Sequence, residues 1–206
     1  MLKRTKGYIL LTLIVVTGLA SRVSTNTLTG KERNFGVNHL KNSKDALLKN
    51  VKNLSSAQLN FKANDSSWSI KECVQHITLA EVELWNWAES VLKQPANPEK
   101  RSEIKVSDEN ILKMVSDRSK KANAPESIVP AKATWKDMEE TLDSFKDERN
   151  KLIKYLKTTT EDVRSHVTQA QLGHIDAYQI ILLISAHTIR HTKQIEEVKA
   201  HPQFPK

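Results

Sequence analysis

The chain has 206 residues, enough for one domain with a sizeable core and an N-terminal extension. Five glycines and six prolines, with 38% hydrophobic and 27% charged residues, favour a helical globular protein over a sheet-rich one. Three basic residues among the first 20 account for part of the formal net charge of +8. The remaining basic side chains are scattered among acidic ones instead of forming a basic stripe, and this pattern argues against a nucleic acid as partner.

Residues 1–20 have the pattern of a secretory signal peptide. A basic start is followed by an apolar run over residues 8–16 and by small residues up to Ala20. We expect cleavage after Ala20 and an exported protein, periplasmic or extracellular, without stable membrane insertion after signal cleavage. An uncleaved N-terminal membrane anchor is the alternative. Residues 21–32 are polar and are predicted to form a linker, which leaves residues 33–206 as the folded domain.

The spacing of apolar residues predicts four long helices along this domain. The first covers residues 34–54, and the second covers residues 70–92 with Ser67 or Ser69 as its N-cap. The third covers residues 134–157, and its charges of mixed sign are assigned to a solvated face. The last helix ends near Lys199.

Two connections between these helices are long. Residues 93–134 carry four of the six prolines and one short amphipathic piece at residues 109–115. We expect them to form a crossover, acting either as a lid over a site or as a solvated loop. Residues 158–176 form the second connection, in which His166 and His174 are predicted to be ordinary surface or turn histidines.

The last helix carries two histidines in an apolar stripe. His187 and His191 stand one turn apart, which lets both imidazoles reach one metal ion. Thr188, Arg190 and Lys193 are predicted to point away from the side of the helix that carries this stripe. The internal glutamate of an HExxH helix is absent here. The pair alone is therefore a weak signal, because two hydrogen-bonded, half-buried histidines near a helix end have the same spacing, and a metal site requires a third ligand.

The second helix supplies a third candidate ligand, His76. Its neighbours on the same helical face are small or apolar, so the three histidines form one cluster if the two helices pack side by side. Glu72 and Glu83 lie on the same side and are candidates for orienting an imidazole or for general-base catalysis. Glu72 also completes a capping box with Ser69. Cys73, the only cysteine, is predicted to pack as a small hydrophobic residue.

Two segments and a short tail resemble a known family. WSIKECVQHI at residues 68–77, HTIRHTKQI at residues 187–195 and PQFP at residues 202–205 are similar to the DinB/YfiT-like superfamily, whose pattern combines a WSxxE…H segment with an HxxxHxxQI segment. The resemblance extends over residues 34–206. It implies an all-α fold, a four-helix bundle with a long crossover connection, and a divalent metal ion held by three histidines, here His76, His187 and His191.

The resemblance also implies a class of activity. Members of the superfamily are described as metal-dependent hydrolases, and some resemble thiol S-transferases that use bacillithiol or mycothiol. Three neutral imidazoles leave a divalent ion with open positions for water or a substrate atom, and nitrogen ligands suit zinc, nickel or iron. We therefore expect a metal-dependent enzyme of the hydrolase or thiol-transferase type acting on a small-molecule substrate. A non-catalytic metal-binding or interaction module is the alternative, and a homodimer is a further expectation.

Overall fold

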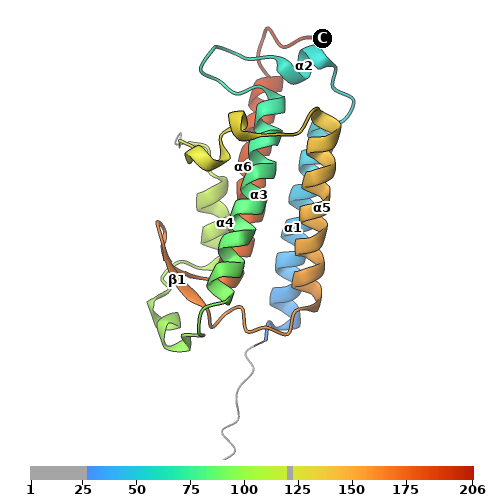
Figure 1. The fold of residues 1–206 in the computed structure, drawn as a ribbon. Coiled ribbons are helices and arrows are strands. Elements are labelled where there is room, and N and C mark those ends of the chain that lie inside the picture. The colour runs from blue at the N-terminus through green and yellow to red at the C-terminus, as the bar shows by residue number, and fades with distance from the viewer. Residues whose placement is uncertain (1–26, 120–122) are drawn as a thin grey trace, which may run out of the picture.

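A computed structural model describes residues 27–119 and 123–206. The predicted signal peptide and residues 21–26 of the predicted linker lie outside these residues. The long helices of the described chain are α1 (Gly30–Val51), α3 (Ile70–Leu92), α5 (Met138–Thr158) and α6 (Ala177–Lys199). They form a bundle in which α1 and α6 run in one direction and α3 and α5 in the other (Figure 1). The predicted all-α fold class is confirmed.

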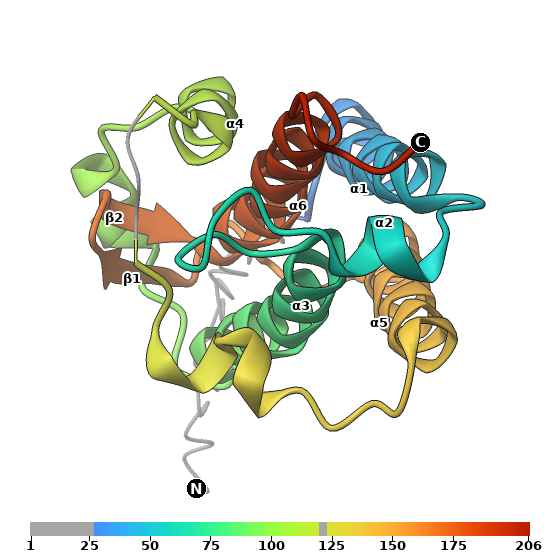
Figure 2. The same ribbon diagram turned by 90° about the horizontal axis from the view of Figure 1, so that it is seen from above.

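Each of α1 and α3 packs against both α5 and α6 (Figure 2). Because α3 and α5 run in the same direction, the chain between them must travel back along the bundle. This crossover contains α4 (Asp108–Ser116) and three 3-10 turns, η1 (Pro98–Glu103), η2 (Glu126–Ile128) and η3 (Pro130–Lys132). Helix α4 packs on α6, and η2 and η3 pack on α3. The crossover therefore covers the two helices that carry the candidate histidines.

Capping residues explain where the helices begin. Ser69 and Glu72 form the predicted capping box, and α3 has the predicted bounds. Helix α1 begins at Gly30, inside the predicted linker, because Thr29 forms a second capping box with Glu32. Helix α5 begins only after its N-cap Asp137, four residues later than predicted. The short helix α2 (Ser56–Asn60) lies between α1 and α3.

The connection before α6 contains a small hairpin that the sequence analysis did not predict. Strand β1 (Val167–Ala170) pairs antiparallel with β2 (Gly173–Asp176). Gly173 has a φ of 96°, in the left-handed region that favours glycine, so it allows the tight turn between the strands. The hairpin ends at Asp176, whose side chain caps α6 by accepting a hydrogen bond from the backbone N–H of Gln179.

One buried arginine connects the four long helices. Arg149 of α5, predicted to lie on a solvated face, is fully buried and pairs with Glu81 of α3 at 2.5 and 2.6 Å. It also donates to the Leu40 carbonyl and the Ser43 hydroxyl of α1, and to the Thr188 hydroxyl of α6. Thr188, predicted to point away from the histidine stripe, is therefore buried among the helices. Helix α6 contacts α1, α3 and α4, so little of its circumference remains exposed.

The two ends of the bundle are fastened differently. At one end, Tyr178 in the first turn of α6 donates to the Glu32 carbonyl in the first turn of α1 at 2.6 Å. At the other, the Pro205 carbonyl accepts a hydrogen bond from Gln58 of α2, and the Phe204 ring meets Phe61 edge to face. No helix within residues 27–119 and 123–206 combines the length and apolarity needed to cross a membrane.

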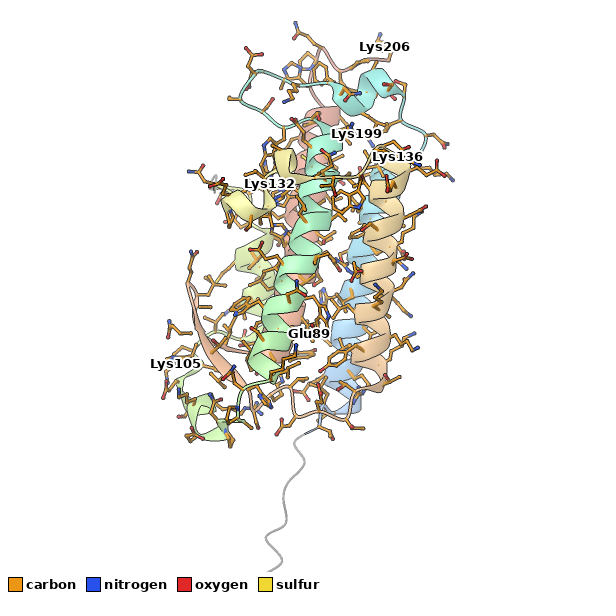
Figure 3. The ribbon with its side chains drawn as sticks, viewed as in Figure 1. Glu89, Lys105, Lys132, Lys136, Lys199 and Lys206 are labelled. Atoms are coloured by element: carbon orange, nitrogen blue, oxygen red, sulfur yellow. The ribbon has the colours of Figure 1, made fainter. Side chains whose placement is uncertain are left out.

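The outer surface is rich in lysine. Lys105, Lys132 and Lys136 are exposed on the crossover, outside the bundle core (Figure 3). The buried side chains are mainly apolar, but they also include the Arg149 network, the ion pair of Arg164 with Asp176 and two of the candidate histidines.

Candidate metal centre

The three candidate histidines converge in space. His76 lies in the second turn of α3, and His187 and His191 lie on the facing side of α6. The Nε2 atom of His76 is 3.2 Å from Nε2 of His187 and 3.1 Å from Nε2 of His191. One nitrogen from each ring lies within 4.8 Å of the other two. The packing of α3 against α6 thus brings together side chains that are more than 100 positions apart in the sequence.

The second nitrogen of two rings determines where the ring proton sits. Nδ1 of His76 lies 2.7 Å from the Ile128 carbonyl oxygen, and Nδ1 of His191 lies 2.8 Å from Oε1 of Gln194. Both oxygens only accept hydrogen bonds, so each Nδ1 carries a proton and donates it. In a neutral ring Nε2 is then unprotonated. The lone pairs of His76 and His191 therefore face each other without a proton between them.

This donor set fits a metal ion. Two unprotonated nitrogens at 3.1 Å cannot form a hydrogen bond, but a cation between them would be attracted to both. A zinc ion with bonds of about 2.0–2.1 Å in tetrahedral geometry separates its nitrogen ligands by about 3.3–3.4 Å. The observed separations of 3.1 and 3.2 Å are close to this value. The cluster could hold a divalent ion with little movement of the rings.

Burial keeps the three imidazoles neutral. His76 and His191 are 2% and 8% exposed, and His187 is half-buried. Burial lowers the pKa of His76, and burial together with the neighbouring His76 lowers the pKa of His191 to about 3. Burial and the other two rings lower the pKa of His187 well below 6.5. At neutral pH the rings are therefore in the uncharged form that binds metal ions.

A cavity of about 510 Å³ adjoins the imidazoles. Its wall is mainly apolar and comes from α3, α4, α6 and the hairpin, including Trp87, Met114, Leu172 and Leu183. The Trp68 ring lies 4.7 Å from the His76 ring and borders the same cavity. Trp87, which the sequence analysis did not assign to a site, also lines it. A substrate bound here would place an apolar group against these walls and a reactive group at the histidines.

A second hollow lies on the other side of His191. Its volume is about 530 Å³, and its lining is more polar, with Asn64, Arg118, Gln194 and Glu197 among the residues that form it. His191 borders both spaces.

The two candidate carboxylates lie elsewhere. Glu72 accepts hydrogen bonds from the Ser69 backbone and from Lys62; burial raises its pKa, but these hydrogen bonds outweigh burial and lower it. Glu83 is exposed on α3. The proposed orienting role of these carboxylates is therefore replaced, for His76 and His191, by the Ile128 carbonyl and by Gln194. Gln194 could have been found from sequence, because it follows His191 by about one helical turn; Ile128 could not.

The cluster of three histidines does not include His166, His174 or Cys73. His166 precedes β1, and Nε2 of His174 in β2 lies 3.1 Å from Glu103. Cys73 is fully buried among apolar side chains of the core, as predicted. Burial raises the pKa of its thiol to about 12.

Fold and site together define a class: a helical bundle with a long crossover and a cluster of three histidines that could bind a metal ion. Residues 39–195 match the DinB superfamily. The chain belongs to this superfamily, and the resemblance stated from its sequence is confirmed.

Two proteins of Bacillus subtilis are similar to the chain. The uncharacterized protein YuaE of strain 168 is 28% identical over 151 residues, which cover 72% of this chain and 88% of YuaE. YfiT, described as a probable metal-dependent hydrolase with an unusual four-helix bundle topology, aligns in structure with a TM-score of 0.57 at 15% identity. The alignment covers 84% of this chain and 89% of YfiT. This likeness supports the four-helix bundle architecture.

Proposed function

We propose that the protein is a divalent-metal-dependent enzyme of the hydrolase type, with His76, His187 and His191 as the metal ligands. The observation that carries the proposal is the convergence of these three rings beside a cavity, with the Nε2 atoms of His76 and His191 unprotonated. The description of YfiT as a probable metal-dependent hydrolase supports the same class. Zinc, nickel and iron all suit a site of three imidazoles.

A divalent ion bound there would supply Lewis acidity, lowering the pKa of water or of a thiol beside it. The chain itself contributes three things. The Ile128 carbonyl and Gln194 keep the ring protons on Nδ1, so that the lone pairs of His76 and His191 face the centre. Trp68 covers two of the rings and limits access of water from its side. The apolar cavity binds and orients the unreactive part of the substrate.

Metal analysis of untagged protein tests the proposal. We expect about one divalent ion per chain, lost when His76, His187 and His191 are all replaced by Ala. The matched control replaces three histidines outside the cluster, His39, His166 and His174, and keeps the metal. Circular dichroism shows whether the variants remain folded. Unchanged metal content in the first triple variant would remove the proposal.

Activity assays separate the possible reactions. Hydrolysis of esters or amides with apolar acyl groups by the metal-loaded protein supports the hydrolase assignment. Transfer to a thiol acceptor would reassign the protein to the S-transferase type, and metal binding without turnover would make it a metal-binding module. Light scattering tests the expected homodimer.

We further propose that residues 1–20 direct export, on the basis of their sequence pattern alone. N-terminal sequencing of the protein recovered outside the cytoplasm is expected to begin at Ser21. Recovery of the intact chain in the membrane fraction would favour the N-terminal anchor instead.

A further inference from the structure

Gln194 receives hydrogen bonds from two donors at one atom. Its Oε1 accepts from Nδ1 of His191 at 2.8 Å and from Nη1 of Arg118 at 3.2 Å. A guanidinium group has donors only, so the atom of the amide that faces it must be the oxygen. Arg118 therefore determines which way round the Gln194 amide lies.

The orientation of this amide decides the tautomer of His191. If the amide were turned over, its NH2 group would face Nδ1 of His191 and would donate to it. The ring proton would then have to sit on Nε2, where it would face Nε2 of His76 at 3.1 Å. A protonated Nε2 cannot bind a metal ion. Among residues 27–119 and 123–206, no group other than Arg118 and His191 forms a hydrogen bond with the Gln194 amide, so without Arg118 its oxygen and nitrogen could exchange places.

Arg118 is itself held in place. Its Nε and Nη2 atoms donate to the two carboxylate oxygens of Glu197 at 2.8 and 2.7 Å, a bidentate pair that fixes the plane of the guanidinium. Gln194 and Glu197 are about one turn apart on α6, so both present their side chains to the same arginine. A continuous chain of hydrogen bonds thus runs from Glu197 at the surface through Arg118 and Gln194 to His191.

We propose that Arg118 is a positioning residue for the metal centre: by fixing the Gln194 amide, it keeps the ring proton of His191 on Nδ1 and leaves Nε2 available as a ligand. This inference rests on the proposed metal-binding function. The crossover would then orient two of the three histidines: Arg118 acts on His191 through Gln194, and the Ile128 carbonyl accepts a hydrogen bond from Nδ1 of His76.

The alternative is that Arg118 only attaches the crossover to α6. Lys193 provides a matched control, because its ammonium group joins the crossover to α6 by donating to the Ser116 carbonyl at 3.2 Å and not to the Gln194 amide. We expect Arg118→Met to weaken Zn²⁺ binding by about tenfold or more, the range found for partners that orient a ligating histidine. Lys193→Met is expected to leave the affinity unchanged. Affinities are measured by competition with a chromophoric chelator.

Repeating Arg118→Met in a protein that also carries a changed residue 194 tests whether Arg118 acts through the Gln194 amide. An ionised carboxylate in the variant Gln194→Glu accepts hydrogen bonds through either oxygen, so it holds the proton on Nδ1 without help from Arg118. In this background Arg118→Met is expected to cause no loss of Zn²⁺ affinity. An equal loss in both backgrounds would show that Arg118 acts by attaching the crossover, and would overturn the inference.

The ring tautomer can also be observed without metal. Nitrogen-15 NMR of the metal-free protein is expected to show His191 protonated at Nδ1 in the wild type, and partly at Nε2 in Arg118→Met. A pure Nδ1–H tautomer in that variant would overturn the inference whether or not metal binds. Wild-type protein that binds no Zn²⁺ would instead refute the proposed function, so the two failures are distinguishable.

Discussion

The buried pair of Glu81 and Arg149 offers the sharpest test of the packing. Glu81→Ala removes a carboxylate that is 2% exposed and accepts two hydrogen bonds from a fully buried guanidinium. Arg149 would keep its charge in the interior, with only one carbonyl and two hydroxyl groups as acceptors. These neutral groups cannot compensate the charge.

The expected cost follows from that uncompensated charge. Removing one partner of a buried ion pair destabilises a protein by about 3–5 kcal/mol. The total free energy of unfolding of a domain is about 5–15 kcal/mol, so Glu81→Ala should lose a large part of it. For a domain of this size the loss corresponds to a fall in Tm of about 6–20 °C.

Urea denaturation followed by circular dichroism measures the loss. Lys146→Ala on α5, the helix of Arg149, is the control, since it breaks an exposed pair with Asp143 and should cost less than about 1 kcal/mol. The double variant Glu81→Leu with Arg149→Met removes both charges and should be more stable than Glu81→Ala. A loss below about 1 kcal/mol for Glu81→Ala, or a double variant less stable than the single one, would refute the reasoning.

Three further predictions concern single positions. Gly36→Ala should destabilise the protein by about 1–3 kcal/mol in thermal denaturation, because its Cβ would lie 2.7 Å from Leu156, whereas Gly30→Ala has open space and should not. The Cys73 thiol should resist iodoacetamide at pH 9 until urea is added. Because the thiol ionises at a lower pH in the unfolded chain than in the folded one, the free energy of unfolding should fall as the pH rises from 9 towards 12. Co²⁺ should quench the fluorescence of Trp68, and Trp68→Phe should reduce this quenching.

Local signals made much of the structure predictable. The bounds of α3 follow from Ser69 and Glu72, whose capping interaction depends on residues three positions apart. The histidine pair of α6 follows from helical spacing in the same way. The likeness of several short motifs to one superfamily then supplied the arrangement of the bundle, which no single motif contains.

Non-local contacts account for what was not predicted. Arg149 lies in a sequence full of exposed charges, and only the approach of three other helices shows that it is buried. Ile128 supports His76 through its backbone carbonyl, so its side chain gives no sign of the role. The strands of the hairpin have four residues each, too few for a clear alternation of apolar and polar side chains.

The hydrogen bond between Tyr178 and Glu32 holds the start of α1, where the chain enters the bundle, beside the start of α6. From Tyr178 to His191, α6 rises about 20 Å, at about 1.5 Å per residue. A protein tethered through its N-terminus, to a bead or to a lipid surface, would therefore hold the imidazoles well clear of the tether and open to solutes from the aqueous phase. Attachment through the C-terminus, which docks near α2 at the opposite pole, would bring the tether to the same end as the imidazoles.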